Sequence, residues 1–365
     1  MGVAVCLLLY SFAVAVIVPG LLVRLTRSGA TPWLAIVAWL TAIVSVLASW
    51  LVATGFLVAA VAQNLDHPVR LATACFAAMR QVAVGGSGPL LQASLFALTA
   101  AATSALAILG WRLSRSMGRA RAQSHRHAVD ARIIGRRVAG LDAVVVDAPE
   151  RIAYSVAGRP DTIVVTSAAF DALDECYLDA VLAHERAHLT GRHHLMLALT
   201  RGLAATLPRV TLFTIGAREI ARLTEMAADD AAARRHGPDT VLGALLALSV
   251  QAPIPSCAAA ATGTDVLARA ERLVTPTTAG WRTRVMLGTI TLLVVLVPLV
   301  VGVHAAIGFG RATPWGLMDR LSLRACPKGA AAQQSFRIGV RERRLVAHES
   351  APLGADQTPP GASSP

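Results

Sequence analysis

The chain has few charged residues and almost no lysine. Asp, Glu, Lys and Arg make up only 15% of its 365 residues, whereas ordinary soluble domains carry about 25%. Lys328 is the only lysine in the sequence. With 55% of residues in the hydrophobic set and a mean hydropathy of +0.56, this shortage of charge argues against an ordinary soluble domain and favours a membrane protein.

Cysteine is also scarce, and motifs that read nucleic acid are missing. The 5 cysteines are scattered, and because no Cys-x-x-Cys occurs, their spacing predicts neither a metal site nor a disulfide framework. The chain is basic, with 34 Lys and Arg against 22 Asp and Glu. Its arginine-rich stretch has no interleaved aromatic residues and no reading motif, so we expect no direct binding of nucleic acid.

Four apolar stretches are long enough to cross a bilayer, which takes about 20 residues per helix. They contain no Asp, Glu, Lys or Arg, and they run from Val3 to Val23, Trp33 to Ala62, Gly88 to Trp111 and Val285 to Phe309. The first has no basic residue before it and is longer than a signal-peptide core, so it predicts a retained helix. We therefore expect an α-helical, multi-pass protein of the cell membrane with four transmembrane helices.

The positions of the arginines predict the orientation of these helices. Arg24 and Arg27 follow the first stretch, and a run of arginines from Arg112 to Arg137 follows the third. Cytoplasmic loops collect Lys and Arg close to helix ends, so both groups are cytoplasmic if the N-terminus is outside. The basic run then needs no nucleic acid to explain it.

This topology divides the chain into four parts. We expect three transmembrane helices within 1–111, a cytoplasmic domain over 112–284, a fourth transmembrane helix over 285–309, and an external, disordered tail over 310–365. Cys75 and Cys326 both fall outside the cell in this arrangement. An oxidising exterior permits a disulfide between them, although two free thiols are the simpler expectation.

The cytoplasmic domain has the pattern of an α+β fold. Three short runs of β-type residues predict a small sheet, and they are Ala143 to Val146, Ala153 to Val156 and Ile163 to Thr166. A helix follows, with Asp174 as its N-cap and Gly191 as its C-terminal stop. A further helix is expected from about Phe213 to Arg235, because Gly237 and a proline follow it directly.

An apolar segment from Leu195 to Ile215 separates these two helices and could be mistaken for another membrane span. A single crossing would place the two helices on opposite sides of the bilayer, and two crossings need about 40 residues plus a turn. We therefore expect this segment to pack in the core of the domain or to lie at the membrane surface.

The first of the two helices carries His184-Glu185-Arg186-Ala187-His188. Residues four apart share one face of a helix, so His184 and His188 can bind one zinc ion through their imidazole nitrogens. Glu185 then lies beside the metal, where it can accept a proton from the attacking water and deliver it to the leaving amine. The motif predicts a zinc-dependent enzyme that hydrolyses peptide bonds, with one Zn²⁺ per chain.

The sequence offers two candidates for the third metal ligand. His194 completes the pattern His-Glu-x-x-His-x-x-Gly-x-x-His, although no Met-turn can be identified downstream. The alternative is Glu225 on the later helix, with Asp229 one turn beyond it and oriented to hydrogen-bond a ligand imidazole. If Glu225 is the ligand, His193 and His194 would form a polar cap after the motif helix.

The combination of four spans, the His184 to His188 motif between the third and fourth, and Glu225-Met-Ala-Ala-Asp229 resembles the transmembrane metallopeptidases of the BlaR/MecR type. It is more distantly similar to the membrane heat-shock and prenyl-protein zinc peptidases. The resemblance implies a gluzincin in which Glu225 is the third zinc ligand. It also implies that the strand Ala153 to Val156 borders the cleft and holds an extended substrate by strand addition.

The tail departs from that resemblance. The β-lactam sensors of this type carry an external penicillin-binding domain whose acylated serine lies in Ser-x-x-Lys. Here Ala325 stands three residues before the only lysine, Lys328, so we expect no penicillin-binding sensor domain.

Three functions remain open. The first is a membrane protease that acts in signal transduction by cleaving a cytoplasmic regulator, with a winged-helix transcriptional repressor as the partner that the resemblance suggests. The second is a quality-control protease for membrane proteins. The third is a non-catalytic receptor or scaffold, against which the intact Glu185 argues.

Overall fold

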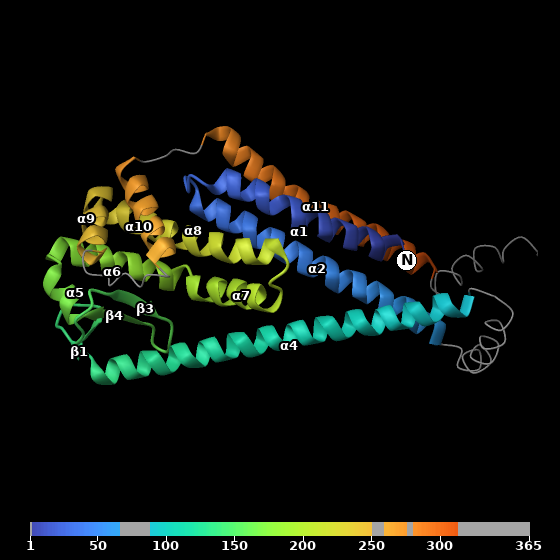
Figure 1. Ribbon diagram of the computed structural model, residues 1–365, viewed down its shortest axis with the longest axis horizontal. Helices are drawn as coiled ribbons and strands as arrows, with labels where there is room; N and C mark the ends of the chain where they lie inside the picture. Colours follow the sequence, from blue (N-terminus) through green and yellow to red (C-terminus); the bar gives the residue numbers. More distant parts are fainter. Residues whose placement is uncertain (1, 66–87, 250–258, 276–279, 313–365) are drawn as a thin grey trace, which may run out of the picture. The chain divides into compact units, whose positions relative to one another are not determined.

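The computed structural model describes residues 2–65, 88–249, 259–275 and 280–312 (Figure 1). Two compact units divide the chain, Met1–Gly302 and Val303–Pro365. The expected pairing of Cys75 with Cys326 and nearly all of the expected tail lie outside the described residues. The fold is therefore that of the first unit.

Four helices among the described residues are long and apolar enough to cross a membrane by length and composition. They are α1 (Gly2–Thr26), α2 (Pro32–Leu65), α4 (Gly88–Ile134) and α11 (Trp281–Ala312). All four contain the apolar stretches that the sequence predicts as spans. In α4 the helix does not end with its apolar part but continues through the arginine-rich segment, where helix-forming Ala and Arg replace the apolar residues.

A four-stranded sheet follows α4. Its strands are β1 (Arg136–Arg137), β2 (Val144–Val146), β3 (Ala153–Val156) and β4 (Thr162–Thr166), and their order in the sheet is β1-β2-β4-β3. The three strands predicted from the sequence are therefore confirmed, to within one residue at their ends. β4 lies in the interior and all five of its residues are buried, whereas β3 forms one edge and, among the described strands, pairs only with β4, in antiparallel register.

Six helices complete the described part of the domain. They are α5 (Ser167–Ala172), α6 (Glu175–Thr190), α7 (His193–Thr206), α8 (Thr211–His236), α9 (Pro238–Ser249) and α10 (Ala259–Val274). The helix α6 begins as predicted, because the Asp174 side chain accepts a hydrogen bond from the backbone N–H of Tyr177 at 2.8 Å. An apolar core joins the sheet, the motif helix α6 and α9.

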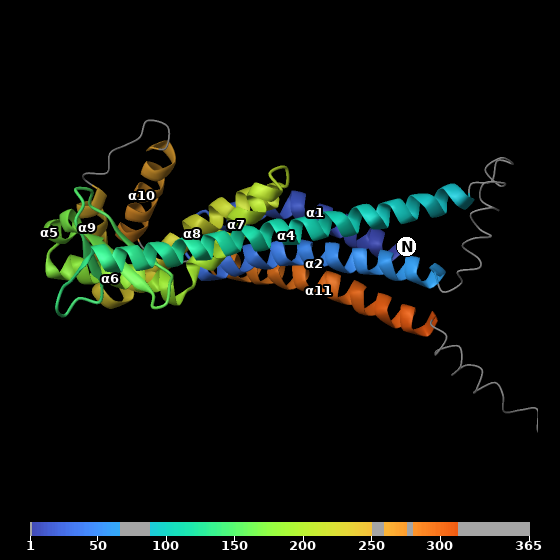
Figure 2. The ribbon, with the colours of Figure 1, turned by 90° about the horizontal axis from the view of Figure 1, so that it is seen from below.

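The helices α7 and α8 form a hairpin that packs against α1 and α2, while α7 also contacts α4 (Figure 2). Thr211 donates to the Ala15 carbonyl at 3.1 Å, and Arg222 donates to the Thr26 carbonyl at 2.9 Å. These contacts are eleven residues apart on each helix (222 minus 211, and 26 minus 15). At 1.5 Å per residue, α8 follows α1 for about 16 Å.

Fully buried apolar side chains explain why this hairpin lies there. Leu203 of α7 and Phe213 of α8 share one core with Trp39 and Ile43 of α2, and each of them is at most 1% exposed. The apolar segment Leu195 to Ile215 is thus neither a single span nor a free surface segment. It packs in a core, as one of the two expected locations has it, but α1 and α2 complete this core, and both are candidate membrane spans.

Candidate metal centre

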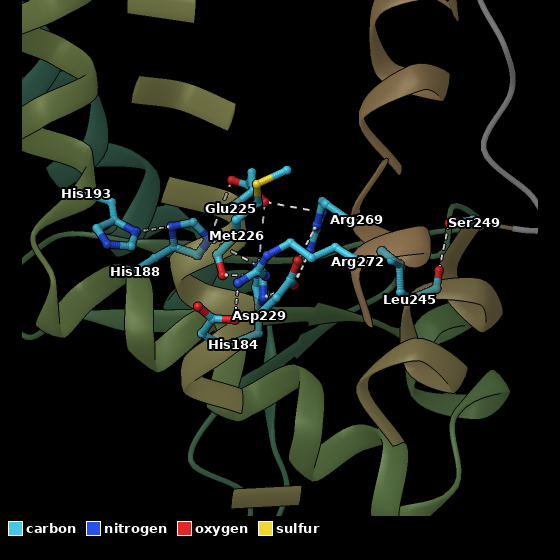
Figure 3. Close-up of polar contacts among 11 residues, drawn as sticks. His184, His188, His193, Glu225, Met226, Asp229, Leu245, Ser249, Arg269 and Arg272 are labelled. Atoms are coloured by element: carbon cyan, nitrogen blue, oxygen red, sulfur yellow. Dashed lines mark hydrogen bonds and ion pairs between the residues drawn. The ribbon is translucent and has the colours of Figure 1, made fainter. Parts of the chain in front are cut away.

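Three side chains from two helices bring their donor atoms together (Figure 3). His184 and His188 come from α6, and Glu225 comes from α8. The two Nε2 atoms lie 3.1 Å apart, and each lies 3.6 Å from a carboxylate oxygen of Glu225. Because α6 and α8 pack closely along their lengths, the later helix completes a cluster that the motif helix begins.

The spacing of these atoms fits a tetrahedral zinc ion. Ligands that lie about 2.0 to 2.1 Å from such an ion are about 3.3 Å from one another. The three measured separations, 3.1, 3.6 and 3.6 Å, fall on both sides of that value. Two imidazoles and one carboxylate also form a ligand set that catalytic zinc sites use, with a fourth position left for water or substrate.

The outer nitrogen of His184 is held by a buried acid. Its Nδ1 lies 3.1 Å from Asp229, whose side chain is only 1% exposed. Arg269 of α10 in turn donates two hydrogen bonds to the Asp229 carboxylate, at 2.7 and 2.8 Å. These hydrogen bonds keep the Nδ1 proton of His184 on the side of Asp229, so a metal that displaces the Nε2 proton would meet a lone pair directed toward Glu225 and His188.

His188 is oriented by a second histidine instead of an acid. The Nδ1 atoms of His188 and His193 lie 2.8 Å apart, so one of the two rings donates and the other accepts. His193 is 2% exposed and its ring also meets Trp33 edge-on, with the centroids 6.0 Å apart. Since Nε2 of His188 faces the cluster, the proton belongs on its Nδ1, and His193 is the acceptor.

The charges within the cluster shift the pKa values of its members in opposite directions. Burial alone would lower the pKa of His184, but hydrogen bonds to Asp229 and Glu225 outweigh it and raise the pKa to about 9. Burial lowers the pKa of His188 to about 4. Glu225 stays ionised, because hydrogen bonding from His184 and nearby positive charge overcome burial and lower its pKa to about 2.

Glu185 belongs to α6, and its side chain meets the edge strand β3. It is 9% exposed, and burial raises its pKa above the ordinary carboxyl value. The charge of His184 and hydrogen bonds from the side chain and backbone of Ser155 in β3 oppose this effect. A carboxylate with a raised pKa is a better proton acceptor near neutral pH, as a general base must be.

A cavity of about 190 Å³ opens beside the cluster. Polar groups of Glu185, Glu225 and Arg269 line one part of it. Apolar side chains of α6 and α9 line the rest, among them Val181, Val241, Leu245 and Leu248. Ala153, the first residue of β3, also borders this cavity, so the edge strand and the cluster face the same space.

The other candidate ligand, His194, lies elsewhere. Its side chain lines a separate cavity, and the charges that act on it are those of Asp161, Arg121 and Arg192. The reason is a turn at Arg192, which has a positive φ of 50° and sends His193, not His194, back toward the motif helix. Within the described residues, the donor cluster is His184, His188 and Glu225.

Two members of the site were not expected from the sequence. Arg269 lies 84 positions after Glu185 (269 minus 185), and no spacing rule connects the two. His193 was interpreted as part of a polar cap, but it is buried against His188. Gly191 gave a partial signal, since a Cβ atom there would lie 2.5 Å from the His193 ring.

Comparison with known families agrees with this geometry. Residues 115–252 match the family model described as peptidase family M48, so a domain of this zinc metallopeptidase family is present in the chain. The match contains α6, α7 and α8, and with them all three clustered donors. No curated protein and no solved structure matches the chain.

Proposed function

We propose that the chain is a membrane-embedded zinc metalloendopeptidase in which His184, His188 and Glu225 hold the metal. The observation that carries this proposal is the convergence of three zinc-type donors beside the buried Glu185, within the M48 match. A zinc ion at this position would lower the pKa of a water molecule to about 7 and polarise the scissile carbonyl group.

The residues of the chain supply the proton transfers and the orientation. Glu185 accepts a proton from the attacking water and passes it to the leaving amine, which is the role its raised pKa suits. Asp229 and His193 orient the two imidazoles from opposite sides. Arg269 keeps Asp229 ionised and fixed, and therefore acts on the reaction through the ligands.

The edge strand β3 is the expected docking site for the substrate backbone. Ser155 in its centre contacts Glu185, and Ala153 borders the cavity beside the cluster. An extended peptide that adds to β3 would therefore pass directly over the catalytic side chains. Strand addition recognises backbone, so side-chain pockets must supply the specificity.

We propose that the substrate is a cytoplasmic regulatory protein and that its cleavage transmits a signal. The arginine pattern supports a cytoplasmic domain, and the contacts of α8 with α1 and of Arg272 with the Gly29 carbonyl place the domain beside the loop between the first two helices. A winged-helix repressor remains a candidate only through the resemblance described above.

Substitution of Glu185 tests the enzymatic proposal. Purified full-length Glu185→Gln should retain zinc and lose at least about 100-fold in cleavage of a mixed peptide library, because only the proton acceptor is removed. Asp179→Asn, on the same helix and outside the cluster, is the matched control. Equal cleavage by wild type and Glu185→Gln would mean that the chain is a receptor or scaffold.

Sidedness is tested separately. Alkaline phosphatase and green fluorescent protein fused after Gly237, at the junction of α8 and α9, report export and cytoplasmic location. We expect fluorescence without phosphatase activity. The opposite result would place the metal cluster outside the cell and remove a cytoplasmic regulator from consideration.

A further inference from the structure

A second, larger cavity lies at the far end of the edge strand. Its volume is about 530 Å³, and it is framed by α4, by the turn that follows β3 and by the beginning of α7. Met117, Leu195 and Ala198 form part of its apolar lining. The proposed enzymatic function makes no use of this cavity.

Basic side chains from three segments line the larger cavity. Arg121 and His125 lie four residues apart on α4 and so project from one face of that helix. Arg159 and His194 line the cavity from the turn after β3 and from α7. Among the described residues, the only acidic side chain in the lining is that of Asp161, which accepts a hydrogen bond from the Gly158 backbone at 2.9 Å.

The strand β3 connects the two cavities. Ala153 at its beginning lines the smaller cavity beside the metal cluster, and Ala157, directly after its end, lines the larger one. At about 3.3 Å per residue, the four steps from 153 to 157 span about 13 Å. A peptide strand that pairs with β3 would place side chains four positions apart, which share one face of the strand, in the two cavities.

We propose that the larger cavity is a specificity site for an acidic side chain of the substrate. The acidic residue would lie four positions from the apolar residue that enters the smaller cavity beside the scissile bond. This inference rests on the proposed peptidase function and adds a substrate class to it, namely peptides that carry Glu or Asp at that distance. The apolar lining suits the methylene groups of Glu, and Arg121 and Arg159 face its carboxylate.

A lipid headgroup fits the same charges less well. The apolar part of α4 ends at Trp111, and Arg121 is ten residues further along one continuous helix. That distance is about 15 Å along the helix. If the apolar part of the bilayer ends near Trp111, the cavity lies beyond the lipid phosphates. The cavity lies at the end of β3, in contrast, where a side chain of a peptide paired with β3 would reach it.

Binding of labelled peptides to full-length Glu185→Gln in detergent micelles tests the inference without turnover. The probes are two rhodamine-labelled peptide pools with an apolar residue at a fixed position and, four residues away on either side, Glu in one pool and Gln in the other. We expect the Glu pool to bind about tenfold more tightly at low salt, with the preference lost at high salt.

Charge reversal identifies the cavity as the source of the preference. Arg121→Glu with Arg159→Glu should remove the preference for Glu and create a preference for a third pool that carries Lys. Arg119→Glu with Arg126→Glu is the matched control, because both arginines are exposed on α4 and lie outside the cavity lining. Loss of the preference in the control, or its persistence in the cavity variant, would overturn the inference.

Competition separates the possible sources of negative charge. Inorganic phosphate or vesicles containing anionic lipid should not displace the Glu pool at concentrations where the unlabelled Glu peptide does. Displacement by either would mean that the cavity is a phosphate or headgroup site. Cleavage of any peptide by the wild type, absent in Glu185→Gln, tests the peptidase function itself, so the two proposals can fail independently.

Discussion

Arg269 holds the carboxylate of Asp229 through two parallel hydrogen bonds, of 2.7 and 2.8 Å, although forty residues separate the two in sequence. Both side chains are removed from solvent, at 14% and 1% exposure. The pair lies behind His184 and sets the direction in which that ring presents its free nitrogen.

The first prediction concerns this pair. Arg269→Met should leave a buried carboxylate without its cation, which typically costs about 3 to 5 kcal/mol. The zinc affinity should fall about 10- to 100-fold because His184 is no longer held. Both are measured on purified protein, as the melting temperature and by competition with a zinc chelator.

The double variant Arg269→Met with Asp229→Asn gives the control. It removes the unpaired charge together with the cation, so much of the lost stability should return while zinc affinity stays low. Arg235→Met, at an exposed position near the end of α8, should change neither quantity. Unaltered zinc binding in Arg269→Met would show that Asp229 is held by other groups.

The second prediction separates the two candidates for third ligand. Glu225→Ala should lose most of the zinc, whereas His194→Ala should keep about one zinc per chain, because the His194 ring lines the other cavity. Metal content by mass spectrometry of the purified proteins measures this directly. A loss of zinc only in His194→Ala would reverse the assignment of the ligand.

The third prediction concerns His193. His193→Phe keeps a ring of similar size against Trp33 but cannot accept a hydrogen bond from Nδ1 of His188. Zinc affinity should fall at least about tenfold while the melting temperature in excess zinc changes little. His194→Phe is the matched control in the neighbouring position. If both variants bind zinc like the wild type, His193 serves only in packing.

The fourth prediction concerns the contact between α8 and α2. A Cβ atom at Gly216 would lie 3.2 Å from Trp39 and 3.3 Å from Ile43. Gly216→Leu should therefore displace α8 and destabilise the fold by about 1 to 3 kcal/mol. Gly55→Leu is the control, since nothing lies within 4 Å of the corresponding position on α2. The two melting temperatures are compared in the same detergent.

Local signals in the sequence predicted much of this domain. Asp174 predicted the start of α6 because a capping side chain acts within three residues, and the strands followed from runs of β-branched residues between turn signals. Glu225 and Asp229 could be paired in advance because a helix places residues four apart on one face. These are all relations between near neighbours in the chain.

The residues that sequence reasoning missed depend on distant or irregular backbone. Arg269 reaches Asp229 from α10, whose position follows from packing between helices and from no periodicity. The interpretation of His193 as a polar cap was wrong because the left-handed turn occurs at Arg192, a residue type that gives no sign of it. Gly191 has φ of −73° and provides room for the His193 ring, besides ending α6.

The long contact between α8 and α1 has a mechanical consequence. One uninterrupted helix carries Thr211 and Arg222, which bind the carbonyls of α1, and Glu225, which faces the two histidines. A helix is stiff along its axis, so α8 moves as one body. If it slides relative to α6 by the rise of one residue, about 1.5 Å, Glu225 shifts by the same amount. That shift is a large part of the 3.6 Å between each Glu225 oxygen and the histidine nitrogen it faces, so the metal affinity of the cluster would change with it.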